Sequence, residues 1–443
     1  MTATGTVLAT LLAVILLSSL VGHSLAKERL DIFKPPVLFS ILMLFCYVFP
    51  LLSVVPGTDS FSTEWDTTPP RTGALEEALA VAALAALSFY FGYYRLPGSR
   101  KQRGFVPASS PQGASIHSAR LKFIVVLFTV VGLGLFYAGV QVVGGFEVLS
   151  TSLGDRLRTF AGLNYLFSAI NLLLSAAIVW WGCELRQGRR GNWRFWSYAA
   201  AALALNALQG NKSTIFIFVL AMTMMYHVLY RPIRARTILL GAAGLFAVLM
   251  VYGLIAREYL AVGNFVTIDP EKLTSEDLSQ AVDRELGGNF LQLQTLTVLV
   301  DRMPEELPYQ HGLTLISLLT MPVPRWLWPD KPLTAPGVFT MAFWPERWLD
   351  EGSTMPPGLV GELYMNFAWA GVAAGMYLFG RAYAHAEKRI REKPGNVPRA
   401  TLYALLIALM LHYLRGEFVS PTITLLMLGL PTLWAERFVL QHS

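Results

Sequence analysis

The chain has 443 residues, of which 54% are hydrophobic and only 14% are charged. Soluble domains carry about 25% charged residues, so this composition excludes an ordinary soluble protein. The net charge of +6 does not indicate a nucleic-acid partner, because the Lys and Arg residues lie in short stretches between apolar runs, as orientation signals do. Cys46 and Cys183 form no motif, so neither a disulfide framework nor a metal site is predicted.

Most apolar residues occur in blocks of about 17 to 22, long enough to cross a bilayer core of about 30 Å as helices. The sequence therefore predicts an all-α polytopic membrane protein with about 11 transmembrane helices, and one membrane domain over residues 1–443. The first run lacks a basic lead-in and a cleavage site, so a retained helix is predicted rather than a signal peptide. The predicted spans are 4–22, 37–55, 74–94, 123–143, 163–182, 195–209, 213–230, 237–256, 358–379, 400–418 and 421–438.

Every second loop is rich in Lys and Arg, and the stretch from Arg95 to Arg103 is the most basic of them. The positive-inside rule then puts the N-terminus outside and the C-terminus, with Glu436 and Arg437, in the cytoplasm. Residues 257–361 are predicted to form one large loop outside the membrane. We find no pair of broken helices of the kind that many secondary transporters contain.

Short helices are predicted within this outer loop. Residues 278–300 form an amphipathic pattern, interrupted by two glycines. The apolar stretch 313–321 is too short to span, so a re-entrant or interfacial segment is predicted, ended by Pro322 and Pro324. Trp326 and Trp328 suit the boundary between water and lipid.

Glu362 introduces a carboxylate at the outer start of the predicted span 358–379, and Asn366 follows one turn later on the same face. Ionisable residues in or near the membrane are expensive and usually functional, which makes Glu362 a candidate general base. The alternative is a structural glutamate that the helix dipole favours.

Arg415 and Glu417 lie near the outer end of the predicted span 400–418, and His412 is one turn before Arg415 on the same helix face. Either these charges belong to a reactive site, or they form a structural ion-pair network inside the helix bundle.

The remaining candidates lie in or beside outer loops. Lys212 follows a short predicted helix, and it either binds an anion in the outer leaflet or extends its ammonium group to the surface. Arg156 is an anion ligand or a solvated loop residue, and Arg257 is an anion ligand or an interfacial anchor. His311 is a second candidate base or an ordinary loop histidine.

Taken together, these residue types indicate a substrate class. Arginine forks suit phosphate and diphosphate, and a carboxylate or histidine suits deprotonation of a sugar hydroxyl. No His, Cys and Asp cluster has metal-ligand spacing, and no glycine-rich loop precedes a helix as nucleotide sites require. The sequence predicts an anionic, pre-activated lipid substrate that is handled outside the membrane.

Four segments carry a family resemblance: Leu30–Pro36 (LDIFKPP), Pro324–Pro332 (PRWLWPDKP), Gly361–Phe367 (GELYMNF) and Arg415–Glu417 (RGE). In this order they resemble the Wzy-type O-antigen polymerases, the oligosaccharide repeat unit polymerases, and the resemblance covers the whole predicted topology. The chain departs from the family at Ala368, where a glycine is expected, and at Lys212, where an arginine is expected.

The resemblance implies a metal-independent glycosyltransferase of the GT-C-like membrane type in the bacterial inner membrane, with residues 257–361 as a periplasmic loop over the active site. Glycan on undecaprenyl diphosphate is the implied donor and acceptor, the product is O-antigen or a related polysaccharide, and a chain-length regulator is a further partner. No cofactor is implied. Glu362 is the first choice for the base and His311 the second. The resemblance assigns Glu362, Arg325, Arg415, Lys331, Tyr364 and Asn366 to catalysis or substrate, and the pattern of charges adds Lys212, Arg156, Arg257, Arg284 and Glu417.

Two other functions remain open from the sequence. An O-antigen ligase would use the same lipid-linked donor and a similar set of charges, but a different acceptor. A transporter or flippase of lipid-linked sugar would place charges near the bilayer midplane and would show paired repeats.

Overall fold

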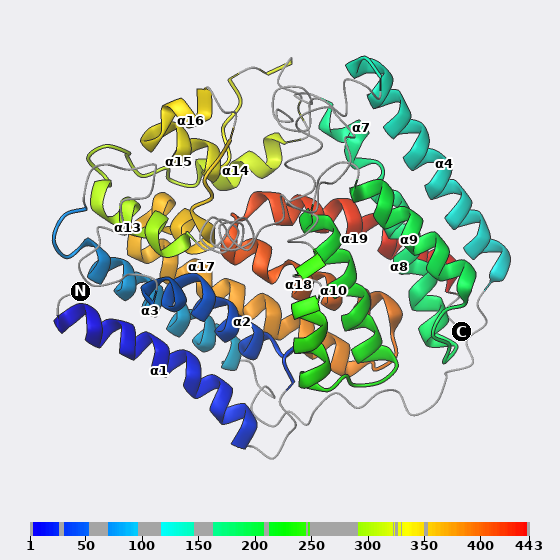
Figure 1. The fold of residues 1–443 in the computed structure, drawn as a ribbon, viewed down its shortest axis with the longest axis horizontal. Helices are drawn as coiled ribbons and strands as arrows, with labels where there is room; N and C mark the ends of the chain where they lie inside the picture. The colour runs from blue at the N-terminus through cyan, green and yellow to red at the C-terminus, as the bar shows by residue number, and fades with distance from the viewer. Residues whose placement is uncertain are drawn as a thin grey trace, which may run out of the picture. The chain divides into compact units, whose positions relative to one another are not determined.

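The computed structural model describes residues 3–25, 31–52, 70–95, 117–145, 163–207, 212–244, 247–248, 291–321, 323, 327–328, 330–349 and 353–440. The elements assigned in these ranges are helices (Figure 1). The prediction of an all-helical protein is therefore confirmed.

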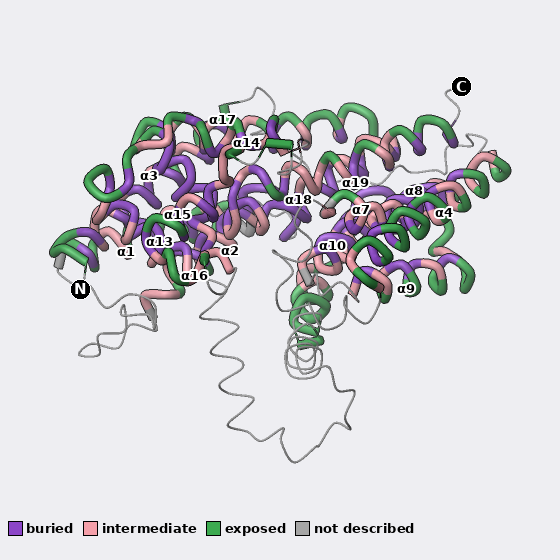
Figure 2. The backbone as a smooth tube through the Cα atoms, turned by 90° about the horizontal axis from the view of Figure 1, so that it is seen from above, coloured by how far each residue is buried: buried purple, intermediate pink, exposed green. Residues whose placement is uncertain are grey.

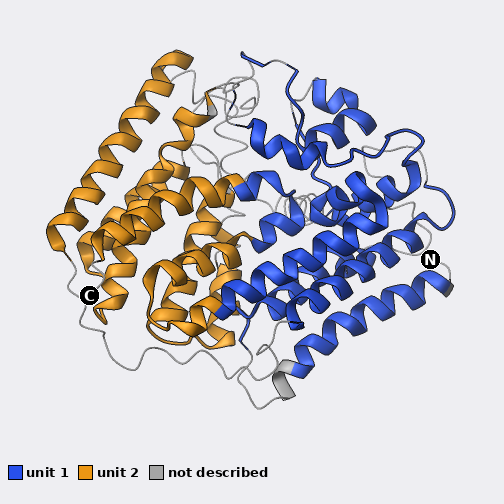
Figure 3. Cartoon of the chain, turned by 180° about the vertical axis from the view of Figure 1, so that it is seen from behind, with its two compact units in different colours: residues 1–104, 282–388, 410–422 blue, residues 105–281, 389–409, 423–443 orange. Residues whose placement is uncertain are grey.

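The chain divides by its internal contacts into two compact units (Figure 3). Unit 1 comprises residues 1–104, 282–388 and 410–422, and unit 2 comprises residues 105–281, 389–409 and 423–443. Both units draw on the last three helices, α17 (Gly358–Glu392), α18 (Val397–Arg415) and α19 (Val419–Val439). A single membrane domain over the whole chain stays a prediction.

Each unit has its own set of further helices. Those of unit 1 are α1 (Ala3–Leu25), α2 (Pro35–Met43) with its π and 3₁₀ extensions (Leu44–Val48 and Phe49–Leu52), α3 (Ala74–Tyr94), α13 (Gln292–Arg302), α14 (Leu313–Thr320), α15 (Ala335–Phe343) and α16 (Pro345–Leu349). Those of unit 2 are α4 (Ser118–Val143), α7 (Asn164–Ser168), α8 (Asn171–Arg186), α9 (Trp193–Ala207), α10 (Lys212–Leu229) and the helical residues 235–244.

Five helices among the described residues are long and apolar enough to cross a membrane: Thr4–Gly22, Ala74–Tyr94, Ser118–Val143, Tyr165–Arg186 and Val397–Arg415. Two shorter apolar helices are Pro35–Leu51 and Ser213–Leu229. Helix α4 buries one stripe, Ile124, Phe128, Gly132 and Phe136, and leaves most of its other apolar side chains exposed, as expected of a helix that faces lipid (Figure 2). A membrane-embedded helical protein is supported, whereas the number eleven stays a prediction.

Helices α3 and α17 of unit 1 approach so closely that their backbones touch. A Cβ atom on Gly92 would lie 2.1 Å from the carbonyl oxygen of Tyr377, and one on Gly380 would lie 2.2 Å from the carbonyl oxygen of Phe89. Small residues of this kind allow helices in membranes to pack at short range. An aromatic stack, with the rings of Phe39 and Phe89 3.7 Å apart, adjoins this contact.

The predicted span 358–379 is wrong in its boundaries, because α17 consists of two helical segments. Phe367 and Ala368 have non-helical dihedral angles, and Ala368 has φ 50° and ψ −143°. The chain folds back there, since a Cβ atom on Gly371 would lie 2.4 Å from the carbonyl oxygen of Leu363. Residues 358–366 measure about 13 Å, too short to span, and residues 369–392 form the long segment.

Other boundaries also differ from the sequence prediction. The predicted span 163–182 corresponds to the candidate span Tyr165–Arg186, within which Ala169 and Ile170 form a turn that separates α7 from α8. The basic residues from Arg381 to Arg391 were expected in a loop, but they continue α17 as a helix. Long basic side chains can extend from a helix end to water, so charge alone does not mark where the helix stops.

Unit 2 is built around α8, which packs against α4, α9 and α10. Its Trp181 ring stacks on Phe195 at 5.2 Å, and its indole N–H donates to the Met222 carbonyl oxygen at 3.1 Å. Glu436 was expected in a cytoplasmic tail, but it is fully buried within α19 and accepts a hydrogen bond of 2.5 Å from the Thr401 hydroxyl. The tail assignment of Glu436 is therefore wrong.

Candidate functional site

A buried polar cluster in unit 1 joins α14 to the short first segment of α17. The Asn366 amide donates to the Thr314 hydroxyl at 2.7 Å and to the Glu362 carbonyl oxygen at 2.8 Å, and its Oδ1 accepts from the Gly312 N–H at 2.8 Å. The Asn366 side chain is thus fully engaged. Two backbone bonds, from Gln310 N–H to Met365 O and from His311 N–H to Asn366 O, extend the junction.

Glu362 is at the centre of this cluster. It has no exposed surface, its Oε1 accepts from the Thr314 hydroxyl at 2.9 Å, and its Oε2 accepts from the Phe418 backbone N–H at 2.5 Å. A second bond, from the Gly358 N–H to the Gly416 carbonyl oxygen at 3.0 Å, joins the same helix to the same turn. Glu362 therefore joins three parts of the chain: α14, α17 and the turn between α18 and α19.

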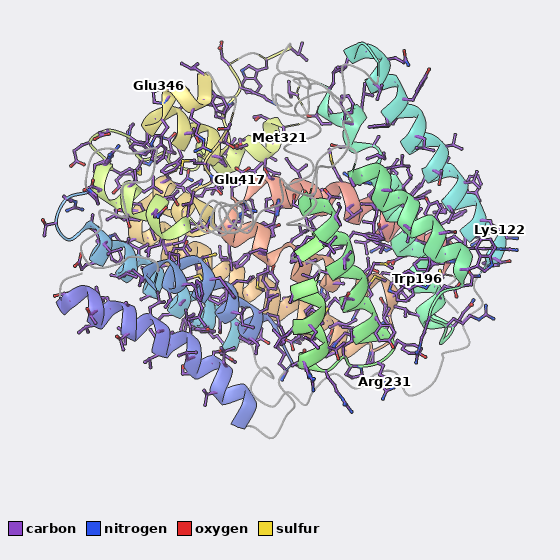
Figure 4. The ribbon with its side chains drawn as sticks, viewed as in Figure 1. Lys122, Trp196, Arg231, Met321, Glu346 and Glu417 are labelled. Atoms are coloured by element: carbon purple, nitrogen blue, oxygen red, sulfur yellow. The ribbon has the colours of Figure 1, made fainter. Side chains whose placement is uncertain are left out.

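That turn, residues 415–418, carries a second buried carboxylate (Figure 4). The Ser420 hydroxyl donates to Oε1 of Glu417, and Thr334 and Ala335, at the start of α15, lie within reach of the same carboxyl. Its Oε2 is buried without a hydrogen bond of good geometry. The turn lies outside the candidate span Val397–Arg415, and burial raises the pKa of Glu417 above its ordinary value, against the opposing effect of the Ser420 hydrogen bond.

Arg415 is half-buried at the end of α18. Its carbonyl oxygen accepts a hydrogen bond of 3.1 Å from the side-chain amide of Gln292 on α13. The backbone that carries Arg415 is thus held by α13 on one side and, through Gly416 and Phe418, by α17 on the other. These contacts hold the backbone from which the Arg415 side chain extends.

Three other candidates in unit 1 have separate surroundings. Tyr364 is buried and packs against Tyr309, with ring centroids 6.4 Å apart, on a different side of the helix from Glu362. His311 is exposed and has a positive φ of 48°, which its backbone bond to Asn366 holds in place. Lys331 is half-buried and donates from Nζ to the Val323 carbonyl oxygen at 2.9 Å.

The remaining candidates lie outside what the structure describes. They are Arg156, Arg257, Arg284 and Arg325, together with the side chain of Lys212, whose backbone begins α10. Their assignments to substrate stay predictions.

Helix α14 has its polar side buried and its apolar side exposed, the reverse of a helix on a soluble protein. Thr314, Ser317 and Thr320 are buried, whereas Leu313, Ile316 and Leu319 are 52%, 49% and 76% exposed. Phe367 at the bend of α17 is also exposed and lies beside Gly312. An outward apolar face of this kind suits lipid. The re-entrant or interfacial position of this segment stays a prediction.

Sequence reasoning missed Thr314, which bonds both Glu362 and Asn366. A signal was present, because Thr314, Ser317 and Thr320 recur every three residues in an otherwise apolar stretch. The role of the Phe418 N–H left no signal, since a backbone group contributes through position and not through residue type.

No group of three or more His, Cys, Asp or Glu side chains in the described part of the chain is arranged to hold a metal ion. Cys46 and Cys183 are both free and buried. No protein-family model matches the chain, and neither the curated proteins nor the solved structures contain a significant match to it.

Proposed function

We propose that this chain is a membrane glycosyltransferase that polymerises oligosaccharide repeat units carried on undecaprenyl diphosphate. One observation supports the proposal most. Glu362, in the segment Gly361–Phe367, accepts a bond from the N–H of Phe418, the residue that directly follows the segment Arg415–Glu417, so two separate parts of the family resemblance lie beside each other. Thr334 and Ala335, which follow another of these segments, Pro324–Pro332, lie beside Glu417.

The proposed reaction breaks the bond between the anomeric carbon of the donor glycan and its diphosphate oxygen. A hydroxyl oxygen of the acceptor glycan bonds to that carbon, its proton passes to a base, and undecaprenyl diphosphate leaves. Arg415 would stabilise the negative charge that grows on the leaving diphosphate, because a guanidinium fork matches phosphate oxygens.

The enclosure of Glu362 favours a positioning role for this residue. Both of its oxygens already accept hydrogen bonds, and no part of it reaches solvent. His311 is exposed one residue from the cluster, so its imidazole is better placed for proton transfer. In this assignment Glu362 holds the turn that presents Arg415, and His311 accepts the proton.

The exposed apolar side of α14 supports a lipid-linked substrate. Leu313, Ile316 and Leu319 lie on the helix whose opposite side bonds the Glu362 cluster. A substrate with a polyprenyl tail and a charged head needs an apolar surface and a polar site in adjoining positions.

The test uses the full-length protein in a lipid nanodisc with one purified lipid-linked repeat unit as the only substrate. A ladder of products with release of undecaprenyl diphosphate supports a polymerase. No ladder with the repeat unit alone, and release of undecaprenyl diphosphate only after a different acceptor is added, indicates a ligase. With the protein reconstituted in vesicles instead, movement of the intact lipid across the membrane without release of diphosphate indicates a transporter and overturns the proposal.

Variants then test the roles. Arg415→Ala and His311→Ala should each lower the rate of ladder formation by about 100-fold or more, the range in which general bases and charge-stabilising groups contribute. Glu346→Gln, an exposed position on α16, is the matched control and should leave the rate unchanged. Wild-type ladders from both Arg415→Ala and His311→Ala would contradict the assignment of these roles.

A further inference from the structure

Six exposed arginines gather on two stretches of unit 2 that the proposed function does not use. Two lie in the turn between α8 and α9, one lies at the start of α9, and three follow α10. We call this surface the arginine face; it consists of Arg189, Arg190, Arg194, Arg231, Arg234 and Arg236.

Side-chain contacts join the two stretches into one surface. Nε of Arg190 donates to the Tyr230 hydroxyl at 3.2 Å, and its guanidinium lies 5.3 Å from the centre of the Tyr230 ring. Trp181 forms ring contacts with both Trp196 and Tyr226, at 5.4 and 6.4 Å. The turn after α8 and the end of α10 are therefore held beside each other.

The arginine face lies where apolar helices end. The candidate span Tyr165–Arg186 stops just before it, and the apolar helix Ser213–Leu229 stops just before Tyr230. Trp193 and Trp196 are 75% and 50% exposed within the face, and Trp196 and Arg231 are labelled in Figure 4. Exposed tryptophans at helix ends are typical of the level at which lipid headgroups lie.

The charge of the face is of one sign. The stretches 186–196 and 230–236 contain no Asp or Glu. The nearest acid along the chain, Glu184, is half-buried and accepts a hydrogen bond of 3.1 Å from the Trp180 indole. All six cations are arginines, whose planar forks match phosphate oxygens in pairs, whereas a lysine offers a point charge.

From these observations we propose that the arginine face binds the headgroups of anionic phospholipids in the leaflet that surrounds it. The exposed tryptophans favour lipid over an acidic protein as the partner. The proposal is independent of the enzymatic reaction, since every residue in it belongs to unit 2 and none belongs to the Glu362 cluster.

A simpler reading treats these arginines as orientation signals alone, and the experiment must separate the two. The full-length protein is purified in a neutral detergent and titrated with fluorescent phosphatidylglycerol, then with the phosphatidylcholine analogue. The test variant is R189Q/R231Q/R234Q, which leaves the Arg190 contact with Tyr230 intact. The matched control is K388Q/R389Q/K393Q, three exposed cations at the end of α17.

The proposal predicts that the test variant binds phosphatidylglycerol at least about fivefold more weakly than wild type, and that the control changes by less than about twofold. Equal losses in the two variants would show that net charge alone attracts the lipid, and unchanged binding in the test variant would show that the face does not bind it. Either result overturns the proposal, as does capture of an acidic protein without phosphatidylglycerol binding.

A second variant covers the case in which the neutral variant inserts wrongly. R189K/R231K/R234K keeps every charge, and with it the orientation signal, but removes the guanidinium forks. It should bind phosphatidylglycerol about two- to threefold more weakly than wild type. Binding equal to wild type would show that the arginines do not act as forks at this surface.

Discussion

Two fully buried glutamates, Glu362 in unit 1 and Glu436 in unit 2, lie in helices of apolar composition and have opposite surroundings. Glu362 accepts bonds at both oxygens, from α14 and from the turn after α18. Glu436 accepts one bond, from Thr401, and its Oε2 has no hydrogen-bond partner among the described residues. We therefore expect the structural importance of a buried glutamate to depend on how many chain segments it bonds, and not on its burial alone.

The largest effect is expected from Glu362→Ala. The change leaves the Phe418 N–H and the Thr314 hydroxyl without their acceptor, and each lost partner costs about 1–3 kcal/mol, so unfolding should become easier by about 3 kcal/mol or more. Thermal unfolding in detergent measures this, alongside the product ladder.

The substitution Glu362→Gln distinguishes two roles of Glu362, holding the turn after α18 in place and accepting a proton. A glutamine amide keeps the shape, and its carbonyl oxygen can accept from Phe418 while its NH₂ donates to Thr314, so stability should fall by only about 1 kcal/mol. If Glu362 only holds the turn, much of the polymerase rate survives. A stable Gln variant without any activity would return Glu362 to the role of general base.

The next largest effect is expected from Asn366→Asp. This change removes the two N–H donors that reach the Thr314 hydroxyl and the Glu362 carbonyl oxygen, and it adds a carboxylate beside an acid. Stability should fall by roughly 2–3 kcal/mol. Asn206→Asp on α9 is the matched control, because Asn206 is buried but bonds one carbonyl of its own helix. Equal losses at the two positions would contradict the importance of the junction.

A small effect is expected from replacing Glu436. Glu436→Gln should change the free energy of unfolding by no more than about 1 kcal/mol, and Glu436→Leu should be tolerated, since a buried carboxyl with one partner often gives way to an apolar side chain without loss. The Thr401 hydroxyl can then bond a carbonyl of its own helix. A loss as large as that of Glu362→Ala would remove the contrast between the two glutamates.

One further substitution is expected to increase stability. Ala368 has a positive φ with ψ −143°, a conformation that glycine adopts without strain, so Ala368→Gly should stabilise the protein by about 1 kcal/mol. Ala374→Gly, at an exposed position within the long segment of α17, should destabilise it by about 1 kcal/mol instead. The two shifts in unfolding temperature should have opposite signs.

The sequence allowed the helical class and most helix positions to be predicted, because apolar runs of the right length are a strong signal, as for Ala74–Tyr94. It did not allow the bend at Ala368 to be predicted. Alanine favours helices, and only the glycine expected here from the family resemblance pointed to this position. Packing of Gly371 against Leu363 overrides the local preference.

The candidate site was predictable in part. Glu362, Asn366, Arg415 and Glu417 were identified from charge and spacing, and the structure brings their segments together. The engagement of both Glu362 oxygens could not be predicted, since it depends on a hydroxyl from α14 and a backbone group beyond α18. Such long-range pairing has no periodic signature in the sequence.

The contact of α3 with α17 sets a limit on how this chain can vary. The backbones of Gly92 and Gly380 lie directly against the backbone of the opposite helix, so each position has room for a hydrogen atom and for no larger side chain. Only glycine fits at either position, and a single added methyl group would force the two helices apart. We expect these two positions to resist change more than any surface loop.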